Sequence, residues 1–218
     1  MIALPFEMKR MVLDAFAGTV FSSPDFDFLG SSFRKEGRAM KKLKGILLAG
    51  LAVGILAGGA ATVVSADSYK QATRIQAATV TLSDAKAIAL QTAGSGKVVS
   101  IDLDGNKAGA VYYDVTVLDG FTEKEYKIDA RTGSILKAKE EPIDDNEDMQ
   151  LTQTNVQLTF KDAERILQQK YPQAHVYDEE LDIWGGQVVY KVEALNGTQK
   201  IKMTIDANSG NILNERIK

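Results

Sequence analysis

Hydrophobic positions follow the same succession of spacings in two stretches of the chain. Each stretch opens with apolar residues at helical spacing, as in Ala85, Ile88 and Ala89, which lie on one face of a predicted helix. A threonine with an aspartate three positions later stands at the start of each helix and predicts an N-cap. The predicted caps are Thr81 and Thr159. The apolar face of the second helix is expected to consist of Ala163, Ile166, Leu167 and Tyr171.

After each helix, apolar and polar residues alternate, which is the period of a strand with one buried face. Dipeptides such as Asp119-Gly120 and Asn196-Gly197 separate these runs and are strong hairpin signals. The pattern predicts an α+β fold of two tandem two-layer units, each with one helix packed on an antiparallel sheet of about four strands. The core faces of the two sheets are expected to hold Tyr113, Val115, Val117, Tyr190, Val192 and Ala194.

One motif, Ile-Asp-Ala-x-[Thr/Ser]-Gly-x-Ile-Leu, occurs at residues 128–136 and again at 205–213. In each copy the aspartate, Asp129 or Asp206, can accept hydrogen bonds from backbone N–H groups just beyond it. The glycine, Gly133 or Gly210, can take the positive φ that closes a turn. We interpret the four residues as a structural turn motif. A pair of catalytic carboxylates is the less favoured interpretation, because the turn alone accounts for both aspartates.

Together, the helix, the Tyr-x-Val strand, the glycine turn and the repeated motif resemble the PepSY domain. The resemblance covers about residues 81–139 and 158–218. PepSY domains occur in the propeptides of thermolysin-type metallopeptidases and in exported or membrane-anchored bacterial proteins. The resemblance implies a protein that binds a peptidase and restrains it. The chain lacks the zinc motif His-Glu-x-x-His, so the resemblance implies action on a separate peptidase.

The repeat also sets the expected domain boundaries. We expect two PepSY domains at residues 80–139 and 157–218. Residues 67–79 are polar and predict a linker or a loose lead-in helix. Residues 140–156 are acidic, with few apolar positions, and predict a flexible, self-repelling linker.

The chain begins with a segment of different character. Residues 1–39 show no sustained period and predict a disordered tail or a mis-assigned start, with translation beginning at Met40. Residues 40–66 predict a signal peptide or a membrane anchor, because three lysines precede an uncharged run at 45–64. We favour cleavage after Ala66. The remainder would be secreted or anchored at the outer face of the cytoplasmic membrane.

Composition excludes several kinds of site. The chain has no cysteine, which rules out disulfides, thiolate metal sites, a cysteine nucleophile and a lipidated cysteine. Its one histidine, His175, rules out a multi-histidine metal site and has no evident catalytic partner in sequence. The part beyond Ala66 is acidic, which argues against nucleic acid as a partner. We expect no cofactor, no metal and no catalytic residue.

Two acidic stretches are candidate calcium sites. Residues 102–106 (Asp-Leu-Asp-Gly-Asn) place glycine and the final ligand at the wrong positions for an EF-hand loop, so a hairpin turn is the favoured interpretation. In the acidic linker nothing would fix the geometry of the ligands, so a solvated linker is favoured there. The linker carboxylates are Asp144, Asp145, Glu147 and Asp148.

A further acidic cluster stands just before the single tryptophan, Trp184. The cluster could face a basic partner, or it could form the solvent side of an edge strand, which we favour. Trp184 could be an exposed anchor for a partner, but packing in the core or at its rim is favoured. The speculative partner-contact set is therefore Trp184 with Asp178, Glu179, Glu180 and Asp182.

These observations lead to one functional expectation and one alternative. The first is an exported, non-enzymatic binding protein that modulates or inhibits an extracellular peptidase, by occlusion or by docking of an edge strand. The alternative is a structural or adaptor module of the cell envelope that binds other exported proteins or wall components. In either case the protein is expected to contact the membrane only through residues 45–64.

Overall fold

The computed structural model describes residues 65–218. The expectations for residues 1–39, and for nearly all of the signal or anchor at 40–66, lie outside the described residues. Within residues 65–218, every helix is too short or too polar to cross a bilayer.

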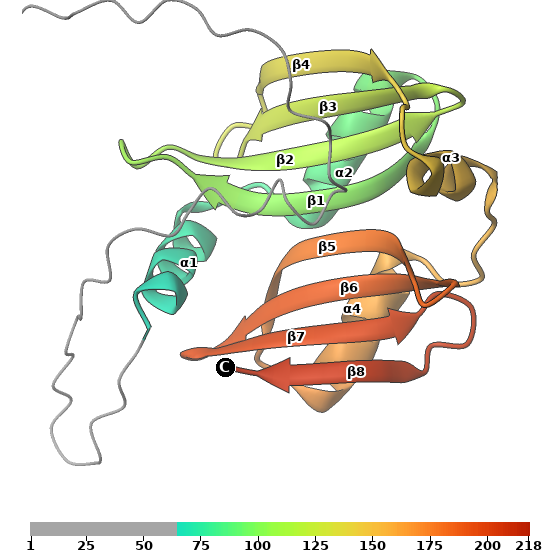
Figure 1. Cartoon of the computed structure of the whole chain (residues 1–218). Coiled ribbons are helices and arrows are strands. Elements are labelled where there is room, and N and C mark those ends of the chain that lie inside the picture. The colour runs from blue at the N-terminus through green and yellow to red at the C-terminus, as the bar shows by residue number, and fades with distance from the viewer. Residues whose placement is uncertain (1–64) are drawn as a thin grey trace, which may run out of the picture. The chain divides into compact units, whose positions relative to one another are not determined.

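The described chain is an α+β structure whose strands form one antiparallel sheet (Figure 1). The strand order is β4-β3-β2-β1-β5-β6-β7-β8. The helices are α1 (Ala66–Ala77), α2 (Leu82–Ala93), α3 (Asn146–Gln153) and α4 (Phe160–Lys170). The strands are β1 (Lys97–Gly105), β2 (Val111–Asp119), β3 (Thr122–Asp129), β4 (Ile135–Pro142), β5 (His175–Trp184), β6 (Gln187–Asn196), β7 (Gln199–Asp206) and β8 (Ile212–Ile217).

Each repeat contributes one half of this sheet, with α2 packed on the β1–β4 half and α4 on the β5–β8 half (Figure 1). The expectation of two tandem units therefore needs a correction, because the two four-stranded sheets are continuous. They join where β1 pairs with β5, through Ser100–Glu180, Ile101–Glu179 and Asp102–Asp178. We call this β1–β5 pairing the seam.

The two predicted helix starts are confirmed. Thr81 and Thr159 are the N-caps of α2 and α4, and each forms a capping box with the aspartate three residues later. The reciprocal bonds satisfy backbone N–H groups that the first helical turn leaves without partners. Small or apolar residues of both helices then pack on the sheet, with Ala85, Ala89, Ala163 and Leu167 all fully buried.

The predicted core faces of β2 and β6 are also confirmed, since all six of their expected residues are buried. The phenolic oxygens of Tyr113 and Tyr190 reach beyond the core and donate to the carbonyls of Val80 and Leu158, each at 2.7 Å. These bonds hold the segment before each helix against the sheet and satisfy a hydroxyl that would otherwise be buried without a partner.

Two apolar clusters fill the interior, and each takes residues from both repeats. Val99 and Leu118 of the first repeat belong to the cluster built mainly by the second. Tyr177 and Leu195 of the second repeat belong to the cluster built mainly by the first. Val99 and Tyr177 lie at irregularities in the strand register, on β1 and β5 respectively. A bulge of this kind redirects a side chain, and here both redirected side chains join the other repeat's cluster.

Residues 67–79, expected to be a linker or a loose lead-in helix, lie mostly in α1, and the segment expected to be a flexible linker contains α3. α1 contacts β1 of its own repeat and β6 of the other, and α3 contacts β5 of its own repeat and β2 of the other. Polar composition suggested linkers, but a few well-placed side chains are enough to dock a short helix. Gln71 is buried and donates to the Leu103 carbonyl at 3.1 Å. Leu151 of α3 is 1% exposed. Both helices therefore bridge the seam.

Candidate functional site

The repeated turn motif has the same geometry in both copies. Asp129 accepts from the backbone N–H groups of Arg131 at 2.9 Å and Thr132 at 2.8 Å. Asp206 likewise accepts from Asn208 at 3.0 Å and Ser209 at 2.7 Å. The hydrogen bond from the Thr132 backbone N–H is the main cause that lowers the pKa of Asp129. The bond from the Ser209 backbone N–H is likewise the main cause that lowers the pKa of Asp206.

The glycines of the motif place the two turns beside different helices. Gly133 (φ +74°) and Gly210 (φ +76°) adopt the left-handed conformation. Gly133 faces Ile88 of α2, and Gly210 faces Ile166 of α4. Each aspartate thus serves a turn that packs on its own repeat's helix, and no contact in the described structure brings the two together.

Replacing Asp206 by asparagine is expected to reduce stability at neutral pH, with the loss disappearing in acid. A carboxyl whose pKa is lower in the folded state stabilises the fold above its ordinary pKa of 3.8, and this contribution fades as pH falls through the folded value. Urea unfolding of Asp206→Asn and the unaltered protein, at pH 7 and at about pH 2, measures the difference. Asp67→Asn, at an exposed aspartate outside the motif, is the control. An equal deficit at both pH values would contradict the assignment.

The acidic cluster of β5 does not lie on an edge strand. β5 pairs with β1 on one side and β6 on the other, so it is interior to the sheet. Asp178 is 7% exposed and Glu179 is completely buried. Glu180 and Asp182 form ion pairs with Lys191 of β6. The expectation of a solvent-facing edge is therefore corrected, because it treated each repeat as a separate sheet.

Trp184 is more exposed than the favoured interpretation predicts. It ends β5 beside the Gly185–Gly186 turn, and 48% of its surface is accessible. Phe121, in the β2–β3 turn, is 75% exposed and was not singled out from the sequence. An exposed aromatic next to a hairpin glycine is the signal that both share. Contact of Trp184 with a partner stays a prediction.

Glu179 lies in a cluster of charged groups that joins the repeats on the helix side of the sheet. Lys86 of α2 donates to Glu179 Oε2 at 2.5 Å and to Glu164 Oε1 of α4 at 3.2 Å. The Lys86 ammonium also lies 4.8 Å from the centre of the Phe160 ring, within the range of a cation–π contact. Burial raises the pKa of Glu179 to about 8; the Lys86 charge opposes this shift and the Glu164 charge adds to it.

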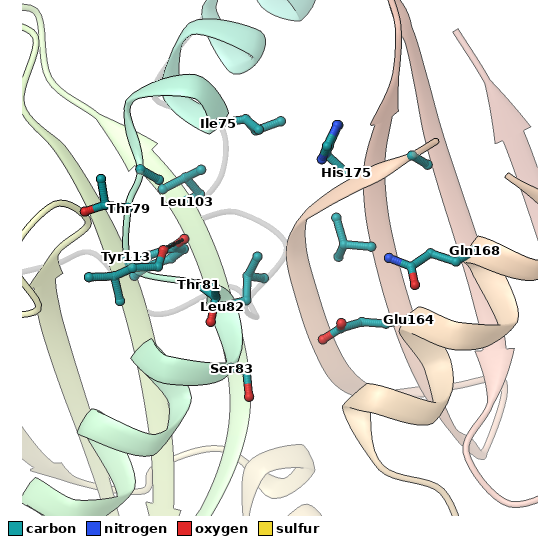
Figure 2. A pocket seen from close by; sticks show the side chains of 14 residues that line it. Ile75, Thr79, Thr81, Leu82, Ser83, Leu103, Tyr113, Glu164, Gln168 and His175 are labelled. Atoms are coloured by element: carbon teal, nitrogen blue, oxygen red, sulfur yellow. Dashed lines mark hydrogen bonds between the residues drawn. The ribbon is translucent and has the colours of Figure 1, made fainter. Parts of the chain in front are cut away.

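A groove runs between the repeats on this side of the sheet. Its larger compartment, about 630 Å³, is lined by residues of both repeats, including Leu90, Val98, Leu158, Phe160 and Tyr190. Its smaller compartment, about 370 Å³, has His175 and Gln168 on one wall and Leu82 and Ser83 on the other (Figure 2). Ser83 and Glu164 line both compartments. Residues far apart in sequence form this groove, so the pattern along the chain did not reveal it.

The larger compartment of the groove has mainly apolar walls and a few lysine amino groups. Leu90 exposes 38% of its surface there. Lys86, Lys97 and Lys161 line the larger compartment. Lys86 is held by Glu179 and Glu164, and Lys97 donates to the carbonyls of Leu151 and Thr154. Among residues 65–218 no three acidic or histidine side chains are placed to hold a metal ion. The groove is suited to binding an apolar segment.

Residues 79–139 and 157–216 both match the family described as "Peptidase propeptide and YPEB domain", PepSY. No curated protein matches the chain. Among solved structures, one described as a "putative lipoprotein" from Clostridium difficile 630 has 21% sequence identity and a TM-score of 0.45. That similarity covers 66% of this chain and 97% of the other.

Proposed function

Because the chain belongs to the PepSY family, we propose that it is an exported, non-enzymatic binding protein that restrains an extracellular peptidase. Export is supported by the lysines and the uncharged run at 45–64. The 218 residues contain a single histidine and therefore no two-histidine zinc motif.

The observation that carries the proposal is the groove between α2 and α4. Its larger compartment falls within the roughly 300–1,000 Å³ of typical ligand sites, and its lining is mainly apolar. An extended peptide segment with apolar side chains would bury Leu90 together with the segment's own apolar surface. Docking a segment of the peptidase there would hold the enzyme against the repeats and block its substrate path.

Inhibition assays on peptidases secreted by the source organism test the proposal. Residues 65–218 should inhibit one of these enzymes in a saturable manner. Leu90→Glu places a charge on the apolar wall and should weaken inhibition by at least about tenfold, equivalent to about 1.4 kcal/mol of binding free energy. Tyr69→Glu, at a residue that is 62% exposed on α1, is the matched control and should inhibit normally. Both variants must unfold at the temperature of the unaltered protein.

Three outcomes separate the alternatives. If Trp184→Ala weakens inhibition and Leu90→Glu does not, the partner binds at the exposed Trp184 and the groove is the wrong site. If no secreted peptidase is inhibited, the peptidase proposal fails. Saturable binding of envelope proteins without inhibition would then favour the adaptor function.

A further inference from the structure

The seam between the repeats is short and carries a buried carboxyl group at its centre. Three residue pairs join β1 to β5, and the middle pair is Ile101 with Glu179. Glu179 is fully buried, and its Oε1 atom has no hydrogen-bond partner among the described residues. A buried charge is costly unless it is fully paired, whereas a protonated carboxyl in the same place is much less so.

The groups that face Glu179 come from three elements. Lys86 approaches from α2 and Glu164 from α4, so one ammonium serves two carboxyl groups. Tyr190 faces it from β6, and the Glu179 charge contributes, after burial, to raising the pKa of Tyr190 to about 12. The neighbours of Glu179 across the strands are apolar, Ile101 on β1 and Val192 on β6. The ionised state of Glu179 is therefore only partly compensated.

The opposite face of the sheet adds carboxylates at the same place. Asp102 and Asp178 are directly opposite across the seam, and their next neighbours are Asp114 on β2 and Glu193 on β6. Like charges in opposite positions on neighbouring strands destabilise their pairing. Lysines flank this row, with Lys127 next to Asp114 and Lys202 next to Glu193. The four central positions of this row are thus acidic, and the lysines lie outside them.

We infer that the seam is a proton-controlled joint, closed when Glu179 is protonated and loosened when Glu179 ionises. Glu179 of the second repeat contacts Lys86 of the first repeat, and the same ammonium group also binds Glu164 of the second repeat. Loosening the seam would let water reach the carboxylate and release its burial cost. The inference concerns the joint alone and does not depend on which partner the groove binds.

The direction of the pH response follows from linkage. The pKa of Glu179 is about 8 when the seam is closed, against an ordinary 4.5. A carboxyl with a raised pKa stabilises the closed state fully below its ordinary pKa, and that stabilisation is lost as pH rises toward the raised value. The ratio of closed to loosened seam should therefore fall by up to about tenfold per pH unit between about pH 5 and pH 8, and then level off.

Thiol labelling in the full-length protein tests the inference, since the chain has no cysteine of its own. Val99→Cys places a thiol on β1 among residues of the other repeat's cluster, so its labelling requires the seam to open. Val115→Cys, 1% exposed inside the first repeat's own cluster, reports unfolding away from the seam. Each rate is divided by the rate for the same protein unfolded in denaturant at the same pH, which cancels the ionisation of the thiol.

We expect the protection of the thiol from labelling to fall with rising pH at position 99. At position 115 it should change much less. Adding Glu179→Gln, which is neutral at every pH, should remove the fall at position 99. If that variant does not fold, Glu164→Gln provides a second test, because it removes one of the causes that raise the pKa of Glu179. The protection at position 99 should then stop falling at a lower pH. Equal pH dependence at the two positions, or a response that survives Glu179→Gln or is unmoved by Glu164→Gln, would overturn the inference.

Discussion

Replacing Leu151 by alanine is expected to lower the free energy of unfolding by about 2–4 kcal/mol, as for a residue of a protein core. Leu151 lies on α3, inside the segment that composition marks as a flexible linker, yet it is 1% exposed and belongs to the cluster that contains Val99 and Leu118. Truncating it removes buried apolar atoms and leaves a cavity that the surrounding sheet cannot fully close. Chemical denaturation measures the change.

Leu136→Ala is the matched control for this prediction. Leu136 lies on β4 and is 52% exposed, so its truncation should change the unfolding free energy by no more than about 0.5 kcal/mol. Similar small changes for both leucines would mean that α3 is not docked in solution and that residues 140–156 behave as the linker expected from sequence.

Replacing Gly210 by alanine is expected to cost about 2–3 kcal/mol. Gly210 has a φ of +76°, which an L-residue adopts with strain, and a new Cβ atom would lie 3.1 Å from Ile166 Cδ1 and 3.3 Å from Leu158 Cδ1. These methyl groups would have to move, which disturbs the contact between the turn and α4. The equilibrium unfolding midpoint and slope give the change in stability.

Gly197→Ala separates the cost of backbone strain from the cost of the new Cβ contacts. Gly197 has a φ of +61° and no atom within 4 Å of the position of a new Cβ, so it carries the backbone strain without the contact and should cost about 1 kcal/mol. Equal costs at positions 197 and 210 would show that the contacts of the Gly210 turn with Ile166 and Leu158 add nothing to the cost of the substitution.

Local features of the chain could be predicted from sequence because neighbouring residues determine them. The caps at Thr81 and Thr159 depend on an aspartate three residues away, and the alternation in β2 and β6 reports directly which side chains are buried. The eight-stranded sheet, the bridging helices and the groove depend on contacts between repeats, which neither periodicity nor spacing encodes.

Glu179 illustrates the difference. In the run from Asp178 to Asp182, its charge makes Glu179 resemble its acidic neighbours, and composition alone predicts that the whole run faces solvent. Its position alternates with theirs, however, and matches that of Leu181, which is 1% exposed. The period of the strand therefore placed Glu179 on the core face. A buried carboxyl group is improbable on composition alone, and only the cluster with Lys86 and Glu164 accounts for it.

The seam also has a consequence for the order in which the chain folds. β1 and β5 lie in different repeats, so the hydrogen-bonding edge of β1 has no partner until residues 175–184 are available. In a chain synthesised from its N-terminus, this strand edge stays uncovered until β5 has been made, and such edges readily pair with other chains. Arrival of the second repeat both completes the sheet and removes that route to aggregation.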